Sequence, residues 1–125
     1  VPPDVTATRI IHEQTGRALA TDVEIADSLF SRARGLMFRG SIPDDYALVL
    51  EMGDGLFGPG RQTIHMLFVR FPIDVIWLVD DEVTRVTQLS PWRGVAGARA
   101  NRVLELPAGG ADGVEAGDTV RVEEV

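Results

Sequence analysis

The chain has 125 residues, 45% hydrophobic and 25% charged, a size and composition typical of one globular domain. It contains no cysteine, which excludes disulfides, thiolate metal sites and a cysteine nucleophile. The formal net charge is −7, and all 12 basic residues are arginine. Such an acidic surface repels nucleic-acid phosphates, so we expect no nucleic-acid partner. An acidic, lysine-free chain predicts a halophilic proteome, with a GC-rich genome as the alternative cause.

The N-terminal residues 1–7 predict an extended linker, because consecutive prolines disfavour helix. Residues 8–125 are then expected to form a single β-rich domain. The longest nearly uncharged apolar run, Ile73–Val79, is far shorter than the ~20 residues that cross a bilayer. The chain begins with Val1 and not with Met, which is compatible with a lost signal or lipid-anchoring segment and equally with a trimmed disordered tail. A lost segment predicts an exported (extracytoplasmic) or membrane-anchored protein that touches a membrane only through that segment, with a cytoplasmic location as the alternative.

The first half of the domain predicts a hairpin, a short helix and a strand. Runs 8–13 and 17–25 flank a Thr-Gly pair, where glycine permits positive φ. Ser28 or Asp27 is suited to cap a helix over "SLFSRARGLMFR", which ends there or at Gly35. The apolar face of this helix consists of Leu29, Ala33, Leu36 and Met37. A strand over 45–52 and a glycine-rich loop over 53–62 follow.

The second half predicts strands only. Ile64–Val69 and Ile73–Val79 are apolar on both faces, which is typical of buried, central strands. Further strands are expected over 83–90, 102–107 and 119–125, with a loop over 91–101 around Trp92. In total, about eight mostly antiparallel strands and one short helix predict an all-β sandwich or jelly-roll-like, partly closed barrel.

Polar residues interrupt the apolar stretch 63–81, among them His65 and Asp74. If Val69–Pro72 forms a tight turn, antiparallel pairing places His65 opposite Asp74 or one pair away. A His–Asp pair on one face resembles the orienting half of a catalytic relay, although no serine or third group identifies itself as a nucleophile. The other interpretation is a buried histidine whose hydrogen bonds only satisfy polar groups.

Arginines and a tryptophan predict a ligand site near the "VRFPID" turn. Arg70 precedes Phe71-Pro72 and is expected to be exposed, where it would grip an anion or pair with an acid. Trp92 and Arg93 predict a stacking platform with a cationic arm, or alternatively a loop anchor packed on the core. Arg34 belongs to an arginine cluster that forms either an anion site or a solvated face. The predicted ligand-binding residues are therefore Arg34, Arg70, Asp74, Trp92 and Arg93.

Five ordered motifs, "SRARGLMFR", "HMLFVRFPIDVIWLVD", "LSPWR", "VLELPAGG" and "GDTVRV", resemble the domain-of-unknown-function family 192, also called uncharacterised protein family 0127. The resemblance covers residues 20–125. Matching positions include Gly35-Leu36-Met37, Pro72, Asp74 and Leu106-Pro107-Ala108-Gly109. The resemblance implies a small β-rich domain of bacteria or archaea, with an N-terminal signal or anchor in many members and no particular activity.

The leading hypothesis is a non-enzymatic, extracytoplasmic binding module for a small anionic ligand or a protein partner. One alternative is a hydrolase-type enzyme that uses His65 and Asp74 as an acid–base pair. Another is an envelope structural or protein-interaction domain, which predicts an exposed apolar patch and no small-molecule site. We expect no metal and no cofactor, because His12 and His65 are far apart in sequence and the glycines match no phosphate-binding motif.

Overall fold

The computed structural model of the protein describes residues 8–124, except for the side chains of Leu29 and Phe30. The predicted linker 1–7 and Val125 lie outside the described residues. The described part contains one helix, α1 (Leu29–Arg34), and ten strands: β1 (Thr8–His12), β2 (Arg17–Ala20), β3 (Asp22–Ala26), β4 (Tyr46–Glu51), β5 (Arg61–His65), β6 (Ile73–Val79), β7 (Glu82–Leu89), β8 (Val95–Arg99), β9 (Arg102–Pro107) and β10 (Val120–Glu124).

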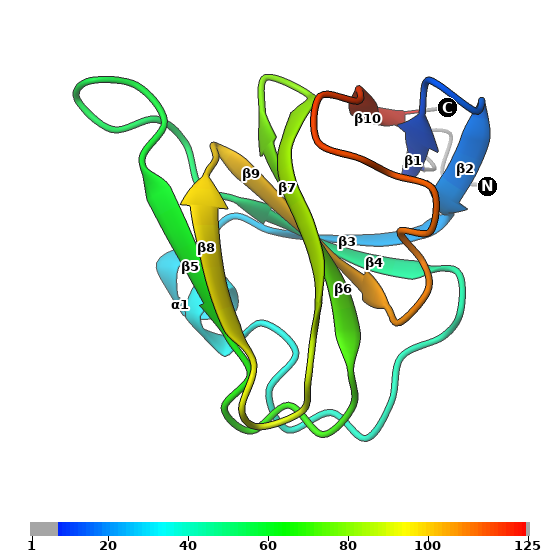
Figure 1. Ribbon diagram of the computed structural model, residues 1–125. Coiled ribbons are helices and arrows are strands. Elements are labelled where there is room, and N and C mark those ends of the chain that lie inside the picture. Colours follow the sequence, from blue (N-terminus) through cyan, green and yellow to red (C-terminus); the bar gives the residue numbers. More distant parts are fainter. Residues whose placement is uncertain (1–7, 125) are drawn as a thin grey trace, which may run out of the picture.

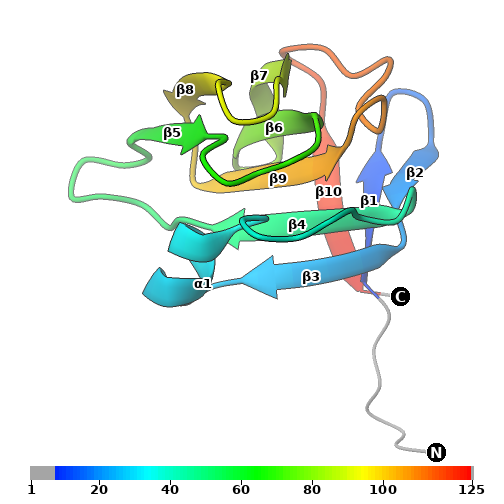
Figure 2. The ribbon, with the colours of Figure 1, turned by 90° about the horizontal axis from the view of Figure 1, so that it is seen from below.

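A five-stranded sheet in the order β3-β4-β9-β6-β7 forms the centre of the molecule. The three-stranded sheet β10-β1-β2 and the two-stranded β5-β8 ribbon lie on different sides of it (Figures 1 and 2). Only the β3–β4 pair is parallel among the strand pairs of residues 8–124. The predicted all-β class, with mostly antiparallel pairing and one short helix, is confirmed. The sheets form a partly closed sandwich with ten strands where about eight were expected.

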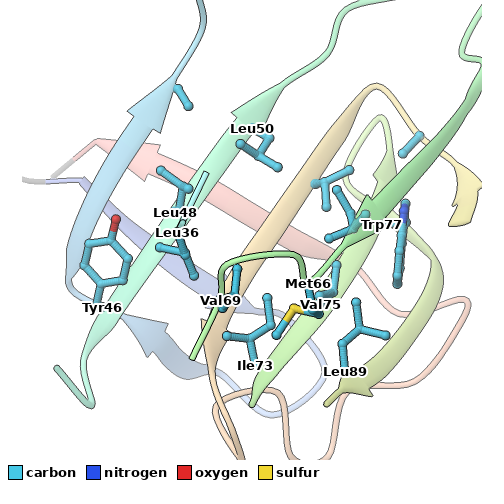
Figure 3. Packing of buried hydrophobic residues seen from close by; sticks show 14 residues of the cluster. Leu36, Tyr46, Leu48, Leu50, Met66, Val69, Ile73, Val75, Trp77 and Leu89 are labelled. Carbon is cyan, nitrogen blue, oxygen red and sulfur yellow. The ribbon is translucent and has the colours of Figure 1, made fainter. Parts of the chain in front are cut away.

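Two hydrophobic clusters fill the space on the two faces of the central sheet. Side chains alternate between faces along a strand, so β6 and β9 contribute to both clusters. Within β6 and β9, the odd-numbered residues face α1 and the ribbon, as Figure 3 shows for β6. They include Ile73, Val75, Trp77 and Val103. Even-numbered residues face the three-stranded sheet, and they include Ile76, Leu78, Leu104 and Leu106. The predicted central strand Ile73–Val79 is confirmed with both of its ends.

The β5–β8 ribbon differs from the sequence prediction. Ile64–Val69 is not a central strand, because β5 ends at His65 and pairs with β8 alone. β8 in turn lies inside the segment 91–101 that was expected to be a loop. The glycine in this strand reflects close packing, since a Cβ at Gly97 would lie 2.9 Å from the Thr63 hydroxyl. The run 17–25 is likewise divided between β2 and β3, which belong to different sheets.

Helix α1 follows its local capping signals. The Ser28 hydroxyl accepts a hydrogen bond from the Ser31 backbone N–H at 3.1 Å, as predicted for an N-cap. The helix does not continue to Arg39 but ends at Gly35, the alternative end, because the φ of 50° at this residue favours glycine. After this turn Leu36 enters the core with 1% exposure. No helix within residues 8–124 is long and apolar enough to span a membrane.

Candidate functional site

Asp74 is buried near the start of β6, and both oxygens of its carboxylate accept hydrogen bonds. Oδ2 accepts from the backbone N–H groups of Gly109 and Ala111, both at 3.0 Å. Oδ1 accepts from the side-chain amide of Gln88 at 3.1 Å. These bonds attach the loop that follows β9 to the central sheet. Asp74 therefore holds a turn of the protein itself, and the structure gives it no free acceptor directed at a ligand.

His65 lies apart from Asp74. It ends β5, pairs with Val95 of β8, and accepts a hydrogen bond on Nδ1 from the Leu67 N–H at 3.2 Å. Asp74 pairs with residues of β7 and β9. The expected hairpin between the two segments is wrong, because residues 66–72 form an irregular loop that joins strands of different sheets. The alternative of an enzyme that uses His65 and Asp74 as an acid–base pair therefore lacks the contact between the two side chains that it requires.

A histidine–carboxylate pair does exist, but it is formed by His12. This side chain is 1% exposed, and its Nε2 lies 2.8 Å from Asp118 Oδ2 while Nδ1 lies 2.8 Å from the Thr15 hydroxyl. Hydrogen bonds from the Glu115 backbone N–H and from His12 hold the pKa of Asp118 below its usual value. The pair ties the β1–β2 hairpin to the loop before β10. It is the structural type of buried histidine that the sequence analysis considered for His65.

Two adjacent loops carry Arg70, Trp92 and Arg93. A hydrogen bond from the backbone N–H of Trp92 to the Val69 carbonyl joins these loops at 3.2 Å. Arg70 and Arg93 are exposed, as expected for Arg70. Trp92 is half exposed and packs against another ring, Phe68, so it is not simply an anchor in the core. The structure thus groups three of the five predicted ligand-binding residues, while Asp74 points into the fold.

Arg34, the fifth residue, lines a different feature, a cavity of about 160 Å³ at the end of α1. The cavity lies between the helix end, β4, β5, β9 and the loop 66–72. Its polar lining residues are Arg32, Arg34, Thr63, His65 and Glu105, and its lining also contains all three methionines of the chain, Met37, Met52 and Met66. Residues 8–124 contain no group of three or more His, Asp or Glu that could hold a metal ion.

Glu105 is the unusual residue of this cavity. It lies on β9, pairs with Val75 and Leu48, and is only 5% exposed. Its carboxyl makes no hydrogen bond or ion pair with the described residues. Burial raises the pKa of Glu105 to about 7, and the positive charge of Arg39 opposes this shift. The cavity therefore contains an unpartnered carboxyl group that changes charge near neutral pH, a property typical of functional sites.

Gly35 keeps the space in front of this carboxyl open. A Cβ at Gly35 would lie 3.7 Å from Glu105 Oε1, and the positive φ of the residue disfavours other side chains. Glu105 was not among the predicted site residues, although a signal was present in the sequence. It is the one acidic residue in the otherwise apolar run "VLELP", in a strand that is buried on both faces.

The model of the DUF192 family, described as "Uncharacterized ACR", matches residues 10–122. The chain belongs to this family. A UPF0127 protein of Pyrococcus horikoshii is 36% identical over 116 residues, which cover 90% of this chain and 96% of that protein. A UPF0127 protein of Thermococcus gammatolerans is 36% identical over 104 residues, and the match covers 80% of this chain and 64% of that protein. The resemblance found in the motifs is thereby confirmed at the level of the DUF192 family.

A solved structure shows the same fold in a more distant protein. A crystal structure from Sinorhizobium meliloti superposes with a TM-score of 0.75 at 22% identity, covering 94% of this chain and 92% of that chain. At this identity the likeness concerns the DUF192 fold alone.

Proposed function

We propose that this DUF192 protein is a non-enzymatic binding module whose ligand site is the cavity of Glu105. The proposal rests on one observation, a buried carboxyl group that lines a cavity and has no hydrogen-bond partner among the described residues. The Glu105 oxygens are not completely enclosed, since among the described residues Arg121 Nε is the one fully buried side-chain polar atom without a hydrogen-bond partner. A ligand in the cavity can therefore donate a hydrogen bond to Glu105. The binding hypothesis is kept, but its site moves from the "VRFPID" turn to the end of α1.

The size and lining of the cavity define the ligand. Its volume of about 160 Å³ is close to that of an engineered cavity that binds benzene, so a molecule of about six heavy atoms fits. Leucine, isoleucine and methionine side chains form much of the wall, which favours a short carbon skeleton. Glu105 favours a hydrogen-bond donor at one end of that skeleton. A small amine satisfies both requirements, and a small alcohol does so without the charge.

Binding of an amine is expected to depend on pH, because only ionised Glu105 attracts a cation. With a pKa of about 7, the ionised fraction of Glu105 is small at pH 6 and large at pH 8. An ammonium ligand should therefore bind roughly tenfold more weakly at pH 6 than at pH 8. An uncharged alcohol should show a smaller dependence, since a protonated carboxyl still offers an acceptor oxygen.

Isothermal titration calorimetry of the full chain with butylamine, butan-1-ol and butyrate at pH 6 and pH 8 tests the proposal. We expect butylamine to bind best at pH 8, and Glu105→Gln to lose this binding. Glu82→Gln, which removes the same charge from an exposed position, is the matched control and should bind as the wild type does. Equal binding by Glu105→Gln would refute the site. Preferential binding of butyrate would instead support the anion site expected from the sequence, with Arg34 as its cation.

We also place the binding module outside the cytoplasm, as the motif resemblance implies. A fusion of the complete gene product to alkaline phosphatase, an enzyme that becomes active only after export, tests this location. An inactive fusion that accumulates in the cytoplasm would contradict it.

A further inference from the structure

Three exposed aromatic side chains, Phe38, Phe68 and Trp92, form a surface that we call the aromatic platform. The ring centroids of Phe38 and Phe68 are 5.1 Å apart, and those of Phe68 and Trp92 are 5.3 Å apart. Their exposed fractions are 61%, 45% and 49%, respectively. They belong to the loops after α1, before β6 and before β8, which meet at the lower end of the molecule in Figure 1. Apolar area of this kind on a surface is typical of an interaction site.

The backbone holds these rings in a fixed and unfavourable conformation. The φ angles of Phe38, Phe68 and Trp92 are 67°, 63° and 65°. Within residues 8–124, the other non-glycine residues with positive φ are Asp80 and Asp81, in the β6–β7 turn. Aspartate tolerates this region, whereas it is strained for a bulky aromatic residue. Such strain persists only where the surroundings impose it, and it is concentrated at functional sites.

The contribution of the rings to the core does not account for this strain. Each ring remains about half exposed, and glycine would adopt the same φ without cost. Backbone hydrogen bonds already join the three loops, from the Phe38 N–H to the Phe68 carbonyl at 3.0 Å and from the Trp92 N–H to the Val69 carbonyl at 3.2 Å. Aromatic side chains at these positions are therefore better explained by contact with another molecule.

Two cations flank the aromatic platform. Arg70 follows Val69, and Arg93 follows Trp92, so the backbone hydrogen bond between Trp92 and Val69 places the two arginines on adjacent loops. Both side chains are exposed, and neither forms an ion pair or hydrogen bond with the part of the chain that the structure describes. In a chain with a net charge of −7, two unpaired guanidinium groups beside apolar rings are complementary to an acidic partner.

We infer that the aromatic platform docks an extended segment of another protein, in which an apolar side chain is flanked by carboxylates. The apolar side chain packs on Phe68 and Trp92, and the carboxylates pair with Arg70 and Arg93. Tryptophan and arginine are the residues most enriched at the energetic centres of protein interfaces. Anionic membranes are typically recognised by clusters of about 4–8 basic residues, whereas the platform is accompanied by the two arginines Arg70 and Arg93, which favours a short acidic segment. The platform shares the loop 66–72 with the Glu105 cavity, but its rings and the two arginines do not line that cavity, so different residues test the two proposals.

Titration of the ¹⁵N-labelled full chain with three synthetic peptides tests the inference. Each peptide has a central leucine, flanked by Asp and Glu, by Asn and Gln, or by Lys. Trp92 provides the signal, and the fully buried Trp77 provides an internal control in the same spectrum. The acidic peptide should shift the Trp92 indole resonance and leave that of Trp77 unchanged. The lysine peptide should bind at least tenfold more weakly, and the Arg70→Ala/Arg93→Ala variant should lose the preference for the acidic peptide.

Glycine variants separate docking from a structural role. Trp92→Gly and Phe68→Gly remove a ring and relieve the strained φ, so each should change Tm by less than about 5 °C and abolish peptide binding. Phe57→Gly is the matched control, since this aromatic side chain is 96% exposed on a different loop, and it should leave peptide binding intact. A large loss of Tm in both platform variants would show that the rings stabilise the fold, and would overturn the inference.

The other possible occupants give different results. A dimer that dissociates in the Trp92→Gly variant, seen by analytical ultracentrifugation, would show that a second copy of the chain covers the platform. A shift of the Trp92 resonance by phosphatidylcholine or phosphatidylglycerol vesicles, without a response to the acidic peptide, would identify a membrane. Either result, or an equal response to all three peptides, would refute docking of an acidic segment.

Discussion

Asp74 and Glu105 are two buried carboxyl groups on paired strands, and they have opposite roles. Asp74 lies opposite Leu106 in the β6–β9 ladder, and Glu105 lies opposite Val75, one position further along. Their exposed fractions are nearly equal, 6% and 5%. Because successive residues of a strand point to opposite faces, Asp74 faces the three-stranded sheet and Glu105 faces α1 and the ribbon.

The two groups differ in their partners. Asp74 accepts three hydrogen bonds, two of them from the backbone of one loop. These donors replace the water that the carboxylate loses when it is buried. Glu105 accepts none from the described residues, and it borders a cavity. Burial alone therefore does not distinguish a structural carboxylate from a functional one. The hydrogen-bond partners do so, because the oxygens of Asp74 are occupied by donors of the protein, whereas those of Glu105 border a cavity that a ligand can enter.

The largest expected effect follows from removing the carboxylate of Asp74, which accepts three hydrogen bonds. Asp74→Ala leaves the N–H groups of Gly109 and Ala111 and the amide of Gln88 without their acceptor, so we expect a loss of about 3–5 kcal/mol in the free energy of unfolding. Urea denaturation measures it. Asp74→Asn is the matched control and should lose less, because its remaining oxygen still accepts from the loop. If both variants were nearly as stable as the wild type, Asp74 would not be the structural partner in this comparison.

Removing the carboxyl group of Glu105 should instead raise the free energy of unfolding above neutral pH. Folding raises the pKa of Glu105 from its ordinary value of 4.5 to about 7, so between these two pH values the folded state keeps a proton that the unfolded state has lost. The stability that protonated Glu105 contributes is fully present below pH 4.5 and is lost as the pH rises through 7. The total loss is about 3 kcal/mol by pH 8. Glu105→Gln should remove this decline and be more stable than the wild type at pH 8.

Denaturation curves of both proteins between pH 4 and pH 8 measure this difference. Glu82→Gln again serves as the control, because a surface glutamate should leave the decline unchanged. A decline that persists in Glu105→Gln would assign the pH dependence to another group, and Glu105 would then resemble Asp74 more than the structure indicates.

Part of the fold was predictable because its signals are local. The end points of β6 follow from an apolar run bounded by a proline and by turn residues. The limits of α1 follow from Ser28 and Gly35, whose capping roles depend only on neighbouring residues. β8 was not predictable in the same way, since its Gly97 is required by the Thr63 side chain of another strand. A pairing partner more than thirty positions away leaves no periodic pattern in the strand itself.

The candidate sites show the same limit. Asp74 was predicted to bind a ligand, but it holds Gly109 and Ala111, which are backbone groups of a distant loop that no motif identifies in advance. Glu105 was visible as an acid in an apolar strand, but the cavity beside it depends on where α1 and β5 pack. The aromatic platform joins residues from three separate loops, and its positive φ angles contradict the preferences of aromatic residues.

The smallest expected effect separates the contributions of the three hydrogen bonds that Asp74 accepts. Gln88→Ala removes the one side-chain donor and leaves both backbone donors in place, so we expect a loss of about 1 kcal/mol. Gln62→Ala, on the neighbouring ribbon, is the control for loss of a partly exposed glutamine in a strand. In a double-mutant cycle, Gln88→Ala should cost almost nothing further in the Asp74→Ala background, because its acceptor is already absent. Additive losses would show that Gln88 acts through other contacts, and the two backbone bonds would then be the whole difference between Asp74 and Glu105.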